Sequence, residues 1–154
     1  MKTKTAKRDV RAILLALLVF ALAGLLAVSA FAQDVAVPPA DRNATQAVIG
    51  DQLEAFRSGD HARAYSHAAP GIKSYFDTVD KFIAMVAKGY GPVYAPQDYT
   101  FGRNTVIDGE VYQEVIITDH QGKQWQAVYT LQRQEDGSWK ITGVKINPHR
   151  GASV

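Results

Sequence analysis

Residues 125–147 read WQAVYTLQRQEDGSWKITGVKIN. Aromatic and apolar residues recur at every second position on both sides of the glycine in QEDG, as at Trp125, Tyr129, Trp139 and Ile141. Period-two alternation of this kind is typical of antiparallel strands that bury one face. The stretch therefore predicts a β-hairpin, and the remainder of the chain is expected to cover its apolar face.

Two glycine-ended turns determine the expected register of the sheet. Residues 119–122 (DHQG) and 134–137 (QEDG) both suit a type I turn followed by a left-handed glycine bulge, which makes a loop with an odd number of residues. An odd loop places the apolar residues of a strand over 111–118 on the same face as those of the hairpin. It also predicts that Leu131 pairs with Ile141.

Two other features of the sheet depend on turn length and on glycine. The turn at residues 108–109 (DG) leaves two registers open, because a two-residue loop turns Val106 inward and a three-residue loop turns Thr105 and Phe101 inward. In the last strand the apolar phase changes at Gly143, which predicts a bulge or a sharp bend there.

The residues ahead of the sheet predict helices. A linker over 33–43 contains two consecutive prolines, which are expected to block an early helix, so the first helix is predicted over 44–58. Asp60 is expected to cap a short second helix, and Thr78 to cap a third helix over 79–88.

These patterns predict the α+β class, with one domain over residues 44–147. Its N-terminal helices are expected to pack on a curved four-stranded antiparallel sheet, giving a cone-shaped roll, and a C-terminal tail is expected over 148–154. The roughly 120 residues that follow position 32 can build one core but not two.

Residues 1–32 predict a signal peptide. Five lysines and arginines precede an apolar run over 12–28, and the small residues of Ala30-Phe31-Ala32 suit a signal peptidase, so cleavage is expected after Ala32. An uncleaved membrane anchor is the alternative, because the stretch from Ala12 to Ala32 is just long enough to span a bilayer. The domain is accordingly expected in the periplasm or outside the cell.

Composition excludes several classes of site. The chain has no cysteine, which rules out disulfides, thiolate metal sites and a lipid-modified N-terminal cysteine. Without residues 1–32 the domain is slightly acidic and its charges are scattered. We therefore expect no nucleic-acid partner and, once the signal has been cleaved, no membrane partner.

The predicted order of elements, with RSGD at 57–60 after the first helix and DGSWKI at 136–141 in the last hairpin, resembles the nuclear transport factor 2-like (cystatin-like cone) superfamily, in which helices pack into a curved sheet. The stretches 52–57 (QLEAFR), 82–86 (FIAMV), 89–94 (GYGPVY) and 101–102 (FG) resemble a narrower group of exported bacterial proteins, domain-of-unknown-function family 4864. The similarity extends over about residues 45–147 and implies a fold and a compartment rather than a reaction.

The resemblance raises the question of catalysis, because the superfamily includes isomerases and dehydratases with an acid or a base in the mouth of the cone. The inward positions of the predicted sheet contain no Asp, Glu or His, and Glu114 falls on the outer face. A general base must lie within hydrogen-bonding reach of its substrate, so no catalytic residue is predicted. An isomerase- or hydrolase-like enzyme is the alternative, and it requires Asp51, Glu54, Asp77 or His67 to face the cavity.

No metal site and no cofactor are predicted. His61 and His67 lie six positions apart, a spacing that does not bring two side chains to the same face of a helix. Metal binding needs several convergent ligands, and the sequence contains no such cluster.

A small-ligand pocket is predicted from the abundance of aromatic residues, since such pockets combine apolar walls with a few polar groups. The alternative is that the rings simply fill the core. Residues 90–96, rich in aromatics and proline, are expected to form either a rim over the cone mouth or a rigid connector. The pocket or rim candidates are Phe82, Tyr90, Tyr94, Phe101, Gln113, Trp125, Tyr129 and Trp139.

The sequence thus favours an exported, non-catalytic domain that binds a small apolar ligand or a protein partner. Tyr112, Ile116 and Val128 on the outer sheet face suggest a homodimer through that face. Besides the enzyme, a third hypothesis is a structural or assembly protein of the cell envelope.

Overall fold

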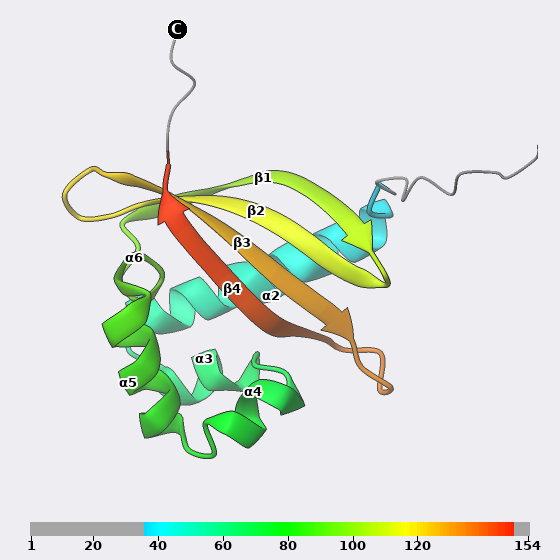
Figure 1. Cartoon of the computed structure of the whole chain (residues 1–154), viewed down its shortest axis with the longest axis horizontal. Coiled ribbons are helices and arrows are strands. Elements are labelled where there is room, and N and C mark those ends of the chain that lie inside the picture. Colours follow the sequence, from blue (N-terminus) through cyan, green and yellow to red (C-terminus); the bar gives the residue numbers. More distant parts are fainter. Residues whose placement is uncertain (1–35, 150–154) are drawn as a thin grey trace, which may run out of the picture. The chain divides into compact units, whose positions relative to one another are not determined.

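The computed structural model describes residues 36–149, in which helices precede a four-stranded sheet (Figure 1). The predicted signal peptide and the end of the predicted tail lie outside the described residues. The helices are α2 (Pro39–Arg57), α3 (His61–Ser66), α4 (Pro70–Tyr75), α5 (Val79–Gly89) and α6 (Gly91–Tyr94). The strands are β1 (Asp98–Ile107), β2 (Glu110–Thr118), β3 (Gln124–Arg133) and β4 (Trp139–Pro148).

The strands form an antiparallel meander in the order β1-β2-β3-β4. The sheet is curved, and α2 runs across one face of it, with α3, α4 and α5 grouped on the same side (Figure 1). The predicted α+β architecture is therefore confirmed.

The predicted register of the β2–β3 and β3–β4 hairpins is confirmed. Val111 lies opposite Leu131, and Leu131 lies opposite Ile141. The glycines that close the two turns, Gly122 and Gly137, have φ values of 76° and 82°. Residues other than glycine rarely adopt this left-handed conformation, so these two glycines are what permit the tight odd-numbered loops.

Of the two registers that the sequence left open for β1, the two-residue loop is the one observed, and Thr105 pairs with Tyr112 on the outer face. Residues 108–109 form a two-residue turn with φ values of 51° and 79°, and this turn pairs Val106 with Val111. A bulge between Phe101 and Asn104 then shifts the phase of the strand. Val106 and Phe101 consequently lie on the same inner face.

The bulge predicted in the last strand is confirmed. Thr130 lies opposite Gly143 while Leu131 lies opposite Ile141, which leaves Thr142 as the extra residue. Because the bulge resets the alternation, the apolar residues on both sides of it face the helices.

Helix α2 begins earlier than predicted. Pro39 is its first residue and Pro38 precedes it, so the prolines start the helix instead of blocking it. The first turn of a helix tolerates proline because its backbone N–H groups have no intrahelical partner there. The predicted caps are confirmed: Asp60 accepts a hydrogen bond from the Arg63 N–H at the start of α3, and Thr78 starts α5.

The core lies between α2 and the inner face of the sheet. Ile49 and Leu53 of α2 and Val115, Tyr129 and Leu131 of the sheet are each 0% exposed. This packing holds the helices against the sheet and defines the walls of the cavity described below. No helix within residues 36–149 combines the length and the apolar character needed to cross a membrane.

Candidate ligand-binding cavity

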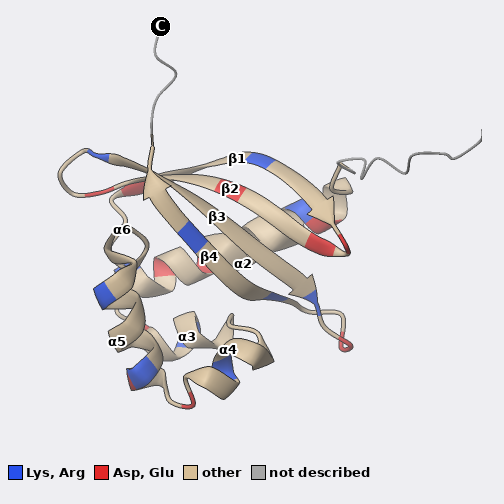
Figure 2. Ribbon diagram, in the orientation of Figure 1, with Lys and Arg blue, Asp and Glu red and all other residues tan. Residues whose placement is uncertain are grey.

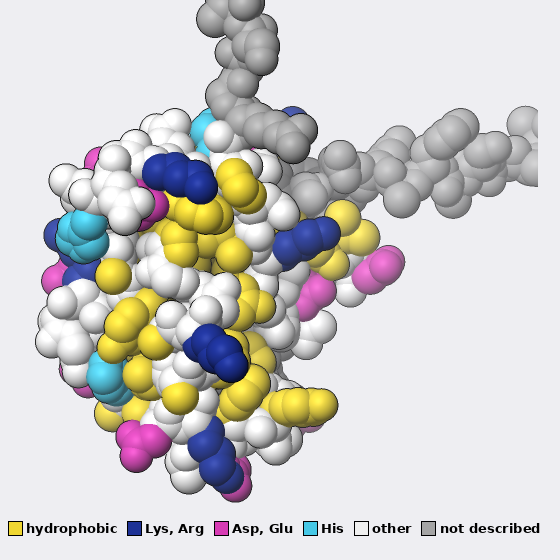
Figure 3. Space-filling model, turned by 60° about the vertical axis from the view of Figure 1, so that its left-hand side comes forward, with side chains coloured by type: hydrophobic (Ala, Val, Ile, Leu, Met, Phe, Trp, Pro, Cys, Tyr) yellow, Lys and Arg dark blue, Asp and Glu magenta, His cyan; other side chains and the backbone are white. Residues whose placement is uncertain are grey.

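An apolar cavity of about 400 Å³ lies between the helices and strand β4. It is open on one side, and hydrophobic side chains gather at the surface where α5 and α6 come forward in Figure 3. Its walls come from α2, the connection after α3, and α4, α5, α6 and β4. The lining residues are Gln52, Phe56, Ala68, Ile72, Phe76, Phe82, Met85, Val86, Tyr90, Val93, Ile141, Thr142, Gly143 and Val144.

Local sequence explains why these walls are apolar. In α5 the spacing of Phe82, Met85 and Val86 places all three side chains along one stripe of the helix. In β4 the bulge at Thr142 turns both Ile141 and Val144 toward the helices. A helix stripe and a bulged strand therefore face each other across the cavity.

Three lining residues have polar side chains. The Thr142 hydroxyl donates to Glu110 and is also hydrogen-bonded to the Thr130 hydroxyl, and both partners lie away from the cavity on the outer face of the sheet. Tyr90 is a half-buried residue. Gln52 is 3% exposed, and its amide nitrogen donates to the carbonyl oxygen of Ala64 at 3.1 Å.

The structure brings two of the eight predicted pocket residues to the cavity, Phe82 and Tyr90. Tyr94 does not line it. The Tyr94 ring packs on Phe56 with ring centroids 5.9 Å apart, and its hydroxyl lies 3.3 Å from His61 Nε2. Tyr94 therefore supports the cavity from behind the Phe56 wall.

Phe101 and Gln113 lie toward β1, away from the cavity. Phe101 packs edge-on against Tyr99 with ring centroids 5.6 Å apart. Gln113 is 0% exposed, and its amide oxygen accepts hydrogen bonds from Gln46 and Asn104. The polar tip of Gln113 is therefore fully used inside the fold.

The other three candidates also serve the fold. Trp125 donates its indole N–H to Asp119 at 2.8 Å and receives Lys123 over its ring, 4.0 Å from the centroid. Tyr129 is 0% exposed in the core, and Trp139 packs against that core from the edge of β4.

Sequence reasoning missed the contributions of α4 and of the bulged strand. Ile72 and Phe76 line the cavity, as does Val144 beyond the bulge. The bulge itself was predicted, so the inward phase of Val144 could have been deduced from it. The position of α4 has no comparable signal in the sequence.

The acidic and imidazole groups that an enzyme would need lie elsewhere. Asp51, Glu54, Asp77 and His67 are all outside the cavity lining. Asp77 instead accepts a hydrogen bond from Lys81 at 2.7 Å, and that bond lowers the pKa of the Asp77 carboxyl.

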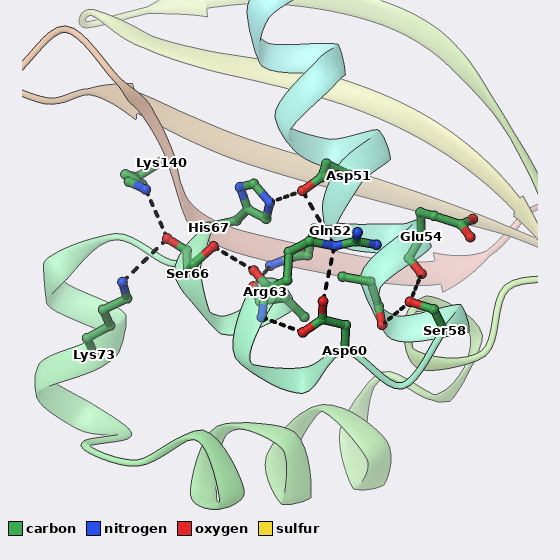
Figure 4. Close-up of polar contacts among 12 residues, drawn as sticks. Asp51, Gln52, Glu54, Ser58, Asp60, Arg63, Ser66, His67, Lys73 and Lys140 are labelled. Atoms are coloured by element: carbon green, nitrogen blue, oxygen red, sulfur yellow. Dashed lines mark hydrogen bonds and ion pairs between the residues drawn. The ribbon is translucent and has the colours of Figure 1, made fainter.

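Asp51 and His67 belong to a polar cluster on the helix surface (Figure 4). His67 Nε2 lies 2.6 Å from Asp51 Oδ2, and Arg63 Nε lies 3.8 Å from both Asp51 and Asp60. These pairs join α2 to α3. They hold α3 against α2, and neither Asp51 nor His67 lines the cavity.

Two lysines meet beside this cluster. Lys73 and Lys140 both donate to the carbonyl oxygen of Ser66, at 3.4 and 2.9 Å (Figure 4). Burial, together with the nearby charge of Lys140, lowers the pKa of Lys73. Within residues 36–149, no group of three or more His, Asp or Glu side chains is arranged to hold a metal ion. Elsewhere, charges of both signs are spread over helices, strands and turns (Figure 2).

The outer face of the sheet carries its own hydrogen-bond network. Glu114 accepts hydrogen bonds from Gln126 and from the backbone N–H of Arg103, and the Gln126 contact is the main reason that the pKa of Glu114 is lowered. Tyr112 donates to Glu110 on the same face. A homodimer through this face stays a prediction.

Comparison with known proteins identifies the family and the fold. No curated protein matches the chain. One similar solved structure is an NTF-2-like protein of unknown function from Silicibacter pomeroyi DSS-3, with 17% identity and a TM-score of 0.50 over 73% of this chain and 100% of that chain. Another is an NTF2-like protein of unknown function from Shewanella baltica OS155, with 13% identity and a TM-score of 0.50 over 73% of this chain and 96% of that chain.

A family model described as "Domain of unknown function (DUF4864)" matches residues 39–154. Both levels of the resemblance predicted from the sequence are confirmed. The chain belongs to the DUF4864 family, and its helices followed by a curved antiparallel sheet form an NTF-2-like fold.

Proposed function

We propose that this domain binds a small apolar ligand in the cavity between α2, α4, α5 and β4, and that it does so without catalysing a reaction. The observation that carries the proposal is the cavity wall. It is built mainly from aliphatic and aromatic side chains and encloses about 400 Å³. Small-molecule pockets commonly have volumes of about 300–1,000 Å³ and this make-up.

The absence of catalysis is supported by the same wall. Its residues include no Asp, Glu, His, Lys or Arg, and Tyr90 is the one ionisable side chain among them. General acid–base chemistry requires a titratable group within hydrogen-bonding reach of the substrate. A bound molecule would therefore contact apolar surface and a few neutral polar groups.

The proposal includes export of the domain, supported by the basic, apolar and small-residue pattern of residues 1–32. Expression of the full chain in a bacterium, fractionation and intact mass measurement test it. A periplasmic protein that begins at Gln33 is expected. A full-length protein in the membrane fraction would replace this part of the proposal with the membrane-anchor alternative.

Ligand binding can be tested with the neutral fluorescent probe N-phenyl-1-naphthylamine. The domain is expected to increase the fluorescence of the probe in a saturable manner. Met85→Trp should abolish saturable binding, because Met85 lines the cavity and the larger ring fills it. The matched control is Ala84→Trp, which adds the same ring to the exposed side of α5 and should leave binding unchanged.

Two results would contradict the proposal. One is wild-type protein that gives no saturable signal, and the other is Met85→Trp protein that is folded by circular dichroism and binds as well as the wild type. In the second case the probe would be bound at another surface.

A further inference from the structure

The cavity contains one polar group that the fold leaves without a partner. Gln52 lies on α2, is 3% exposed and forms part of the cavity wall. Its amide nitrogen donates to the carbonyl oxygen of Ala64. Among residues 36–149, no hydrogen bond is made to the amide oxygen of Gln52.

Chemistry determines which end of the Gln52 amide faces Ala64. A backbone carbonyl oxygen can only accept, so the NH₂ group must point toward it and the amide oxygen must point away. Because Gln52 forms part of the cavity wall, this oxygen can accept a hydrogen bond from a donor on a ligand or from a water molecule in the cavity. The Gln52 oxygen is thus available as a hydrogen-bond acceptor in an otherwise apolar wall.

The other polar side chains of the wall do not duplicate this role. The Thr142 hydroxyl is hydrogen-bonded on the outer face of the sheet, and Tyr90 is only half-buried, whereas Gln52 is 3% exposed. Gln52 is therefore the residue at which a polar group on the ligand has most to gain.

We propose that the ligand is a neutral apolar molecule that carries a hydrogen-bond donor, a hydroxyl or an N–H group, and presents it to the Gln52 amide oxygen. This inference rests on the proposed function and adds the chemical class of the ligand. A carboxylate does not fit, because no Lys or Arg lines the cavity and an unpaired charge is costly to bury. A pure hydrocarbon or an ether would leave the Gln52 oxygen without a donor.

Three probes with one ring system test this class: 1-naphthol, 1-methoxynaphthalene and 1-naphthoate. Their dissociation constants are measured by displacement of N-phenyl-1-naphthylamine at pH 7. 1-Naphthol is expected to bind about five times more tightly than its methyl ether, which corresponds to one neutral hydrogen bond. 1-Naphthoate is expected to bind at least about ten times more weakly than 1-naphthol, because its charge would be buried unpaired.

Variants of the cavity wall test which residue causes the preference for 1-naphthol over its methyl ether. Gln52→Met keeps the length of the side chain and should remove the preference for 1-naphthol over the ether, while both compounds still bind. Gln132→Met makes the same substitution at an exposed position of β3 outside the cavity; it is the matched control and should retain the full preference. Tyr90→Phe tests the alternative that the Tyr90 hydroxyl, not Gln52, binds the donor. If Gln52→Met does not fold, Tyr90→Phe still shows whether the hydroxyl of 1-naphthol forms its hydrogen bond with Tyr90 instead.

The outcomes separate this inference from the proposed function. Equal binding of 1-naphthol and its ether by the wild type, or loss of the preference in Tyr90→Phe, would overturn the role of Gln52 and leave the apolar cavity as a binding site. Tightest binding by 1-naphthoate would overturn the neutral class of the ligand. Failure of all three probes and of N-phenyl-1-naphthylamine would instead refute the proposed function itself.

Discussion

Replacement of Tyr129 by phenylalanine is expected to stabilise the domain, although Tyr129 lies at the centre of the core. The ring is 0% exposed on β3, and its hydroxyl has no hydrogen-bond partner among residues 36–149. A buried hydroxyl without a partner costs about 1–3 kcal/mol, and removal of its oxygen leaves the ring contacts in place. Allowing for the small void created, we expect a gain of about 1 kcal/mol, or roughly 4 °C in Tm.

The same hydroxyl makes the expected gain depend on pH. Burial, with a smaller contribution from Tyr99, raises the pKa of Tyr129 far above its ordinary value. The pKa of Tyr129 is thus higher in the folded state than in the unfolded state, where it is about 10. Below pH 10 the hydroxyl is neutral in both states and stability does not depend on its ionisation. As the pH rises above 10, ionisation favours the unfolded state and the free energy of unfolding falls. At pH 11 the unfolded chain gains about 1.4 kcal/mol from ionisation of this one residue, which Tyr129→Phe avoids.

The assay is urea unfolding followed by circular dichroism at pH 8 and pH 11, with Tyr75→Phe as the control. Tyr75 is 87% exposed and lies outside the core, so its replacement should change stability little at either pH. Tyr129→Phe should exceed the wild type by about 1 kcal/mol at pH 8 and by more than 2 kcal/mol at pH 11. A loss of stability of about 1 kcal/mol or more at pH 8 would refute the reasoning, because it would mean that the hydroxyl has a partner such as an ordered water molecule.

Three further predictions concern the parts of the fold that hold the cavity in place. Leu53→Ala should reduce the free energy of unfolding by about 3 kcal/mol in urea titrations, because Leu53 is 0% exposed and its loss leaves a void between α2 and the sheet. A reduction of less than about 1 kcal/mol would contradict the described core packing. Thr78→Ala should cost about 1 kcal/mol, since the Thr78 hydroxyl accepts the Lys81 N–H at 3.3 Å at the start of α5, whereas Thr78→Ser should restore the cap and most of the stability. Glu114→Gln should make the free energy of unfolding depend less on pH in acid. The pKa of Glu114 is lowered in the folded state, so its contribution to stability is present above the unfolded-state pKa of about 4.3 and is lost as the pH falls through the folded-state value. Equal slopes for wild type and variant in acid titrations would show that Glu114 has no such role.

Interpretation of these variants depends on where each residue lies relative to the cavity. Leu53 and Tyr129 are buried in the core and do not line the cavity, so their replacement should change stability more than ligand affinity. Met85 and Gln52 line the cavity, and their replacement should change affinity more than stability. If all four variants changed stability and ligand affinity together, the core and the cavity wall would be energetically coupled.

Much of the sheet could be predicted from the sequence because its signals are local. Alternation along 111–118 and 125–133 identified the buried face, and the two glycine-ended turns determined the parity of the loops, which the observed pairing confirms. The phase change at Gly143 predicted the β4 bulge for the same reason. Each of these signals lies within a few residues of the feature that it predicts.

The first strand shows where such reasoning stops. The apolar pattern contained both Val106 and Phe101, which no uninterrupted strand can place on one face. The bulge between Phe101 and Asn104 resolves the conflict, and Glu114 of the neighbouring strand holds it by accepting the Arg103 N–H. That contact spans two strands, so the sequence of β1 alone does not contain it.

The cavity depends still more on tertiary structure. The sequence by itself determined that the domain has helices on a curved antiparallel sheet, which residues face inward, and that many of them are aromatic. Only the packing decided that Tyr129 and Gln113 are buried in the core while Phe82 and Tyr90 border open space beside Gln52. The physical reason is that alternation and helical stripes specify the direction of a side chain, whereas the distance between α4, α5 and β4 decides whether that side chain meets another atom or a void.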